Sequence, residues 1–196
     1  MKKKRLLLAV TCLTLLLGGC AFGEDVDTTT IIVDKKGTVV ESIVEDFDKD
    51  YYNADDLEGM ITKEIQDYNS TAGGEKVKLD SFELTEDGKQ VKVKIQYGSA
   101  DDYKQMNERE LFCGTVSDAY NAGYEFVSMT DQETGAAVSQ GEVLELGNKK
   151  IVISEEALDI RVSGKITHVS EGITVKDHKT AVLPDDGEKL SYVIYE

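Results

Sequence analysis

"VKLDSFELTEDGKQVKVKIQYG", residues 77–98, is the stretch that decides the fold. Asp87-Gly88 at its centre is a dipeptide typical of a two-residue hairpin turn. After this turn, Val, Val, Ile and Tyr at alternate positions are separated by Lys92, Lys94 and Gln96. Alternation with a period of two places the apolar side chains on one face of a strand. The stretch therefore predicts an antiparallel hairpin.

A second hairpin and a helix are predicted immediately upstream. Residues 30–44, TIIVDKKGTVVESIV, place two β-branched apolar runs around a Lys-Lys-Gly turn. Residues 53–69, NADDLEGMITKEIQDYN, follow as a helix, with Asn53 as the N-cap, Asp56 as its acidic N3 partner and Gly73-Gly74 closing the unit. The apolar residues of this helix share one face at helical spacing: Leu57, Met60, Ile61, Ile65 and Tyr68.

A further capped helix is predicted after residues 77–98. Its start, SADDYKQM at 99–106, repeats the Ala, two Asp and Met of NADDLEGM at 53–60. The match fits either an ancient duplication of a hairpin–helix unit or the same capping chemistry used twice. We expect Gly114 to interrupt this helix and another helix to begin at the N-cap Thr115 and stop at Gly123.

From residue 124 onward the sequence is built from short β-type runs separated by Gly, Asn, Asp or Ser. The runs are YEFVSMT, GEVLEL, KKIVIS, ALDIRV, KITHV, GITV, KTAVL and KLSYVIY. Their density predicts antiparallel sheet. The predicted fold class is α+β, with antiparallel sheets, two or three short capped helices in the N-terminal half and a β-rich C-terminal part. The folded domain is expected to span 31–196, either as one unit or as hairpin–helix units, 31–140, and a β-rich subdomain, 141–196.

The first twenty residues have the pattern of a secretory leader. Residues 2–5 are basic, residues 6–17 are mostly apolar, and two glycines precede Cys20. Twelve helical residues span about 18 Å, against a hydrocarbon core of about 30 Å. The apolar run is therefore too short for a comfortable membrane span.

Leu17-Gly18-Gly19-Cys20 resembles the lipobox of bacterial lipoproteins, although Gly18 stands where that family usually has Ala, Ser or Thr. The resemblance implies that residues 1–19 are a signal peptide removed before Cys20 and that the Cys20 thiol carries a diacylglycerol. Two acyl chains hold a protein on a membrane where one would let go. Residues 20–30, polar and rich in threonine, would then be a lipidated tether. The expected partner is the cell membrane, at its extracytoplasmic face.

The charge of the chain argues against nucleic acid as a partner. Thirty-eight Asp and Glu against 22 Lys and Arg give a formal charge of −16. Removing residues 1–19 takes away four basic residues and no acid, so the remainder carries −20. Such a body is repelled by nucleic-acid phosphate. We expect no nucleic-acid binding, and a basic peptide or a cation is the partner that the charge would attract.

Residues that could carry catalysis are few. Cys113 remains alone once Cys12 leaves with the leader and Cys20 takes the lipid, and its apolar neighbours predict burial. A hydrolytic triad needs a histidine base, but His168 and His178 have no nucleophile motif near them. These two histidines with a nearby Asp177 or Asp186 could only just make a zinc site. We expect exposed histidines and name no catalytic residue.

The sequence singles out neither a pair of catalytic carboxylates nor an aromatic platform for a sugar. Paired carboxylates serve glycoside hydrolysis, but 38 acids form pairs everywhere and none stands out. Sugar sites commonly use tryptophan platforms, and the chain has no tryptophan. Tyr51 and Tyr52 could substitute, although neighbours on a strand would point in opposite directions.

The densest acidic segment contains a second set of candidate metal ligands. Asp46, Asp48 and Asp50 alternate as D-x-D-x-D, which resembles the start of an EF-hand calcium loop. The resemblance stops at Tyr51, where the loop needs Gly, and at Leu57, where it needs Glu. We expect a solvated acidic loop, with an irregular Ca²⁺ site on these three aspartates as the alternative. No other cofactor is expected.

The size and overall pattern resemble small surface lipoproteins of Gram-positive bacteria, a resemblance that implies no particular activity. The expected function is that of a membrane-anchored extracytoplasmic lipoprotein with a non-catalytic binding or envelope-structural role. The alternative is an enzyme outside the cell that uses carboxylates or a divalent cation. Convergent carboxylates in a concave site would favour the enzyme, and acids spread over convex faces would favour the binding protein.

Overall fold

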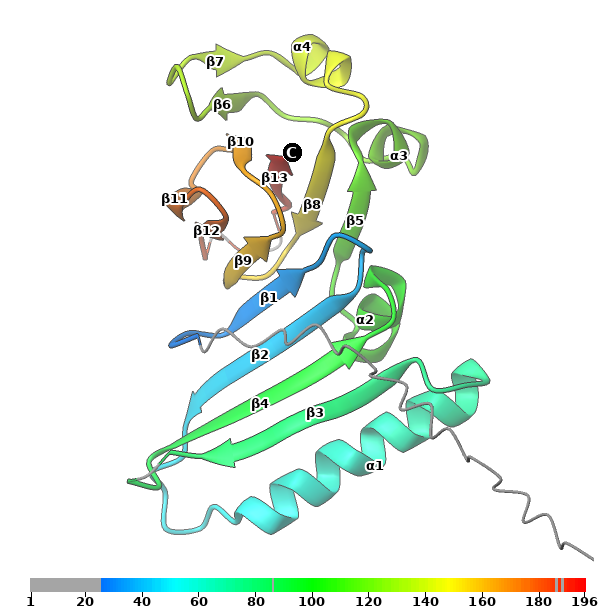
Figure 1. Cartoon of the computed structure of the whole chain (residues 1–196), viewed down its shortest axis with the longest axis vertical. Helices are drawn as coiled ribbons and strands as arrows, with labels where there is room; N and C mark the ends of the chain where they lie inside the picture. The colour runs from blue at the N-terminus through cyan, green and yellow to red at the C-terminus, as the bar shows by residue number, and fades with distance from the viewer. Residues whose placement is uncertain (1–25, 86, 186, 188) are drawn as a thin grey trace, which may run out of the picture.

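The computed structural model describes residues 26–85, 87–185, 187 and 189–196 (Figure 1). Its strands form two sheets. One sheet has the strand order β11-β12-β9-β1-β2-β4-β3. Its strands are β1 Thr30–Val33, β2 Val39–Asp46, β3 Val77–Leu84, β4 Gln90–Tyr97, β9 Asp159–Val162, β11 Thr174–Asp177 and β12 Thr180–Val182.

The other sheet has the order β5-β8-β13-β10-β6-β7. Its strands are β5 Leu111–Thr115, β6 Met129–Asp131, β7 Ala137–Val138, β8 Lys150–Ser154, β10 Ile166–Ser170 and β13 Ser191–Tyr195. The helices of the described residues are α1 Ala54–Ala72, α2 Ala100–Asn107, α3 Val116–Asn121 and α4 Gln140–Glu145. Sheets with most helical residues in the N-terminal half and a β-rich C-terminal part confirm the α+β class.

Both predicted hairpins are confirmed. β1 pairs with β2, and β3 pairs with β4, each antiparallel. Along β4 the alternation is complete, because Val91, Val93, Ile95 and Tyr97 are buried while the residues between them are only partly covered. Gly88 has a φ of 69°, which is the left-handed conformation that the turn requires and that glycine adopts without strain.

Helix α1 begins where the sequence predicts and continues three residues past the predicted stretch, up to the predicted Gly73 stop. The Asn53 side chain accepts a hydrogen bond from the backbone N–H of Asp56, and Gly73 ends the helix in the left-handed conformation. Ile65 is buried, and Leu57, Ile61 and Tyr68 pack against the core as partly buried residues. Met60 was predicted on the same face but is exposed, so that prediction is wrong.

The structure corrects two predictions about the segments that follow. Gly114 does not interrupt α2, which already ends at Asn107 because Glu108 takes a φ of 55°. Residues 111–115 form strand β5, paired with β8. The run GEVLEL, residues 141–146, is predicted as a strand but lies almost wholly in helix α4, whose capping box is formed by reciprocal hydrogen bonds between Ser139 and Glu142.

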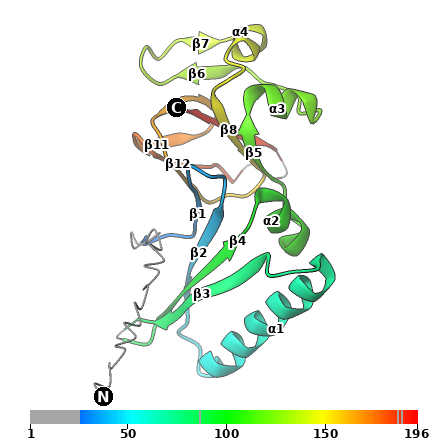
Figure 2. The same ribbon diagram turned by 45° about the vertical axis from the view of Figure 1, so that its right-hand side comes forward.

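The two sheets interleave along the chain and share a core. β9 returns from the C-terminal half to pair with β1 in parallel, so a cut at residue 140 would divide both sheets. One continuous cluster of buried side chains holds Ile31 and Tyr97 of the first sheet together with Leu111 and Val193 of the second. A smaller cluster lies under α3 and α4, around Val116 and Val143. Figures 1 and 2 place α3 and α4 together at the end of the molecule away from α1.

Candidate functional site

The predicted lipidation and cleavage residues, Leu17, Gly18, Gly19 and Cys20, lie outside the described residues. Within the part of the chain that is described, no helix is both long and apolar enough to cross a membrane.

Residues near the start of the described chain are hydrogen-bonded to the folded body. Thr28 donates its hydroxyl hydrogen to the buried carboxylate of Asp159 at 2.7 Å, and Lys176 donates to the same oxygen at 2.7 Å. The Thr29 side chain accepts from the backbone N–H of Val44 at 3.1 Å. Strand β1 then begins at Thr30. Residues 28–30 of the predicted tether therefore belong to the folded body, because Thr28 and Thr29 are hydrogen-bonded to it and Thr30 begins β1.

The three aspartates of the candidate calcium site do not converge. Asp46 ends β2 and accepts a 3.4 Å hydrogen bond from Gln90. Asp48 pairs with Lys49 at 2.8 Å, and that cation lowers the pKa of the Asp48 carboxyl. Asp50 lies in the exposed turn before α1. Among the described residues no group of three or more His, Cys, Asp or Glu is arranged to hold a metal ion.

The histidines and the cysteine also remain apart. His168 is 8% exposed, and its ring lies 3.5 Å from Asp131. Burial lowers the pKa of His168, and Asp131 opposes this effect. The expectation of exposed histidines is therefore wrong for His168, while His178 lies in the exposed turn between β11 and β12. Cys113 packs against the core from β5, and burial raises the pKa of its thiol to about 12.

Within the described part of the chain, α3 and α4 border a groove that has an apolar rim. Its volume is about 480 Å³, and it is lined by Tyr120, Gly123, Tyr124, Glu125, Phe126, Gln140 and Leu144. Tyr120 and Leu144 form an exposed apolar rim, at 60% and 40% exposure. Pockets of this volume, mostly apolar with a few polar groups, are typical of small-molecule sites.

The wall of the groove is held in place by hydrogen bonds. Tyr192 donates its hydroxyl hydrogen to the backbone carbonyl of Glu125 at 2.7 Å, which fixes the backbone beside the buried Phe126. Tyr124 donates to Glu110 at 2.5 Å, and Glu110 also pairs with Lys104 at 2.6 Å. These bonds connect the groove to α2 and to the second sheet, so the groove exists before any ligand arrives.

An exposed aromatic cluster lies at the opposite end of the molecule, between β2 and α1. The rings of Phe47 and Tyr52 are 5.0 Å apart, and those of Tyr52 and Tyr51 are 4.9 Å apart. Tyr51 is 79% exposed and Tyr52 is 42% exposed. The expectation that these two tyrosines point in opposite directions is wrong, because they lie in a turn rather than on a strand.

A buried polar network links β2 and β4 of the first sheet with α2 and with the segment between β8 and β9. Tyr97 donates to Glu41 at 2.7 Å, and Tyr103 donates to Glu156 at 2.6 Å. The two rings meet edge to face at 5.0 Å, and Asn107 donates to the Tyr97 hydroxyl at 3.1 Å. Burial, followed by the charge of Glu156, raises the pKa of Glu41. Both tyrosines are fully buried, so the centre of this network is closed to a substrate and the arrangement fits a structural role.

Sequence reasoning missed both the groove and the aromatic cluster. The groove depends on α4, and the signal that could have found this helix is the Ser139-x-x-Glu142 capping box, which is overlooked when Val143, Leu144 and Leu146 are interpreted as a short apolar strand. The aromatic cluster depends on a turn in which Tyr52 N–H donates to the Lys49 carbonyl at 2.9 Å. No Gly, Pro or Asn-Gly signal marks that turn within residues 47–52.

Comparisons of the chain with protein-family models, with curated proteins and with solved structures gave no match. The function must therefore be argued from the geometry of the chain itself.

Proposed function

We propose that this chain is a lipid-anchored protein of the cell envelope that acts outside the membrane by binding. The lipobox residues Leu17–Gly18–Gly19–Cys20, behind a basic and apolar leader, support the anchor. The fold supports a short tether, because Thr28 is already hydrogen-bonded to Asp159 of the body. The chain takes eight residue steps from Cys20 to Thr28 and so reaches about 28 Å at most. The body is then held close to the lipid surface.

The groove between α3 and α4 is the observation that carries the binding role. Its exposed apolar rim, and a wall that Tyr192 holds in place through the Glu125 carbonyl in the loop after α3, suit a small ligand with one apolar face. Glu125 at the groove offers a carboxylate for a hydrogen-bond donor on that ligand. We therefore propose as ligand class a small molecule with one apolar face and at least one N–H or O–H donor.

The anchor is tested by replacing Cys20 and fractionating the cells that express the protein. Cys20→Ala is expected to abolish incorporation of labelled palmitate and to leave the leader uncut. Cys12→Ala, a cysteine lost from the same leader, is the matched control and should be processed and lipidated like the parent. Processing and lipid labelling of Cys20→Ala at the parental level would overturn the proposed anchor.

The groove is tested with indole, a planar probe with one N–H donor, on the full chain held in nanodiscs. Saturation-transfer NMR, with empty nanodiscs as background, should show transfer to indole that is lost in Leu144→Glu. Tyr51→Ser, which changes an exposed aromatic residue at the other end of the molecule, is the matched control and should bind like the parent. Equal transfer in the parent and in Leu144→Glu would contradict binding in the groove.

A further inference from the structure

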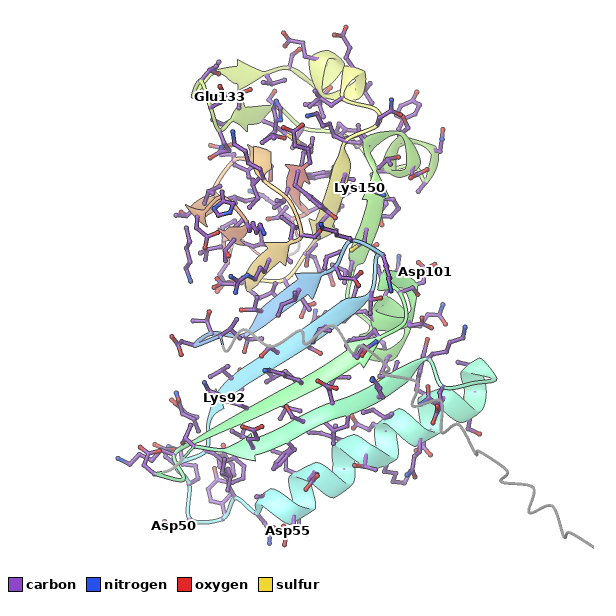
Figure 3. All side chains as sticks on the ribbon, viewed as in Figure 1. Asp50, Asp55, Lys92, Asp101, Glu133 and Lys150 are labelled. Atoms are coloured by element: carbon purple, nitrogen blue, oxygen red, sulfur yellow. The ribbon has the colours of Figure 1, made fainter. Side chains whose placement is uncertain are left out.

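The surface between β2 and α1 combines exposed rings with excess negative charge. We define the aromatic–acidic patch as the rings of Phe47, Tyr51 and Tyr52 with the acids of residues 45–58. These acids are Glu45, Asp46, Asp48, Asp50, Asp55, Asp56 and Glu58, and all of them are exposed. Figure 3 shows Asp50 and Asp55 close to this end of the first sheet, far from Glu133 at the other end of the molecule.

The local backbone explains why the rings stay outside. The Phe47 N–H donates to the Lys89 carbonyl at 2.6 Å, which extends the β2–β4 pairing by one residue and sets the Phe47 ring against the core. The turn closed by Tyr52 N–H on the Lys49 carbonyl then brings Tyr52 onto Phe47 and Tyr51 onto Tyr52. Each ring rests on the next, so Tyr51 is held in place with most of its surface in water.

Charge selects the kind of partner for this patch. Residues 45–58 hold seven acids and one basic residue, Lys49, which is already paired with Asp48 at 2.8 Å. The pairing raises the pKa of Lys49 through the hydrogen bond to Asp48 and leaves this cation engaged. An anionic lipid surface is repelled by this charge. A lysine or arginine side chain is attracted both by the carboxylates and by the face of an exposed tyrosine ring.

We propose that the aromatic–acidic patch docks a cationic segment of a partner protein, with a Lys or Arg side chain over the ring of Tyr51. The proposal goes beyond the groove proposed above and rests only on the location outside the membrane proposed there, because it names the chemistry of a protein partner at a second surface. Tyrosine and arginine are the residues enriched at the energetic centres of protein interfaces. The carboxylates around Tyr51 supply attraction at a distance and so raise the rate of encounter.

The test uses a fluorescein-labelled peptide of alternating Arg and Gly and the full-length protein in detergent at about 0.15 M NaCl, the physiological ionic strength. Fluorescence anisotropy should show saturable binding, with no binding of a Ser-Gly peptide of equal length. Tyr51→Ala should weaken binding about five-fold, as expected for loss of one cation–π contact. Tyr51→Phe, which keeps the ring, should bind within about two-fold of the parent.

Matched controls separate the patch from diffuse charge. Val127→Ala trims an exposed apolar side chain that belongs to neither the patch nor the groove, and it should leave the affinity unchanged. Asp48→Asn with Asp50→Asn should weaken binding more than Glu133→Gln with Glu171→Gln, which removes the same charge from exposed positions elsewhere. Equal effects of the two charge-removing pairs, or parental affinity in Tyr51→Ala, would overturn the proposal.

A membrane-facing role of the patch is distinguished by repeating the titration in phosphatidylcholine nanodiscs. Binding should persist there. Binding in detergent that disappears in nanodiscs would mean that the rings rest on lipid, and this outcome would overturn docking of a protein segment. The detergent titration does not depend on the lipid at Cys20, so failure of the proposed anchor and failure of the docking proposal give different results.

Discussion

The hydroxyl group of Tyr103 donates a hydrogen bond to the Glu156 carboxylate at 2.6 Å, which joins α2 to the segment between β8 and β9. The two residues are 53 positions apart in the chain. Tyr103 is 1% exposed, and its ring meets Tyr97 edge to face. The contact therefore connects α2, which follows β4 of the first sheet, with the segment that leads into β9 of the same sheet.

Removing the Tyr103 hydroxyl should destabilise the fold. Tyr103→Phe leaves the ring in place but deprives Glu156 of a charge-assisted bond, which should lower the free energy of unfolding by about 1–2 kcal/mol. For a chain of this size the melting temperature should fall by roughly 3–6 °C. Circular dichroism during heating measures the change. Tyr120→Phe, with an exposed hydroxyl, is the control, and an equal loss in both variants would contradict the role given to the bond.

Glu41→Gln should change the pH dependence of stability. Burial and the charge of Glu156 raise the pKa of Glu41 in the folded state above its ordinary value of 4.5. A raised carboxyl pKa means that the folded state holds the proton more tightly than the unfolded state does. The protonated Glu41 therefore contributes to the free energy of unfolding below about pH 4.5, and this contribution is lost as pH rises through the folded-state pKa.

The Glu41→Gln side chain cannot ionise, so the variant avoids the cost of a buried charge at this position. It should therefore be more stable than the parent at about pH 8, with the difference shrinking toward about pH 4. Urea unfolding at a series of pH values measures this difference. Glu171→Gln, at an exposed position, is the control and should show no such trend. A difference in stability between the parent and Glu41→Gln that stays constant across this pH range would refute the raised pKa of Glu41.

Asn53→Ala should weaken the start of α1. The Asn53 side-chain oxygen Oδ1 accepts a hydrogen bond from the Asp56 N–H at 3.1 Å, and losing an N-cap side chain costs about 1 kcal/mol. Asn53→Asp keeps a capping oxygen and should stay close to the parent. Chemical unfolding followed by far-UV circular dichroism compares the two variants, and indistinguishable midpoints for Ala and Asp would speak against the cap.

Calcium should stabilise the protein no more than sodium chloride of equal ionic strength. The carboxylates of Asp46, Asp48 and Asp50 do not gather on one point among the described residues, so both salts should act by screening repulsion. A specific site at about 100 times its Kd would add about 2.7 kcal/mol. That would raise the melting temperature by roughly 5–10 °C. A calcium-specific rise of this size, abolished by Asp48→Asn with Asp50→Asn, is the result that would restore the metal site.

Local chemistry was enough to predict the hairpins and the helix starts. Asp87-Gly88 and the alternation after it predicted β3 and β4, and Asn53 and Thr115 were correctly placed as N-caps. Each of these signals acts within a few residues of its own position. The lipobox at Cys20 is also a local signal, and it remains a prediction.

The partnership of distant segments was decided only by the tertiary structure. Nothing in residues 159–162 indicates that they pair in parallel with residues 30–33, because any β-branched run can complete the same ladder. Whether Gln140–Glu145 becomes a strand or a helix depends on the buried site that receives Val143 beneath α3. The exposed stack of Phe47, Tyr52 and Tyr51 follows from where β2 ends against β4, and that register is fixed by the shared core rather than by the sequence of the turn.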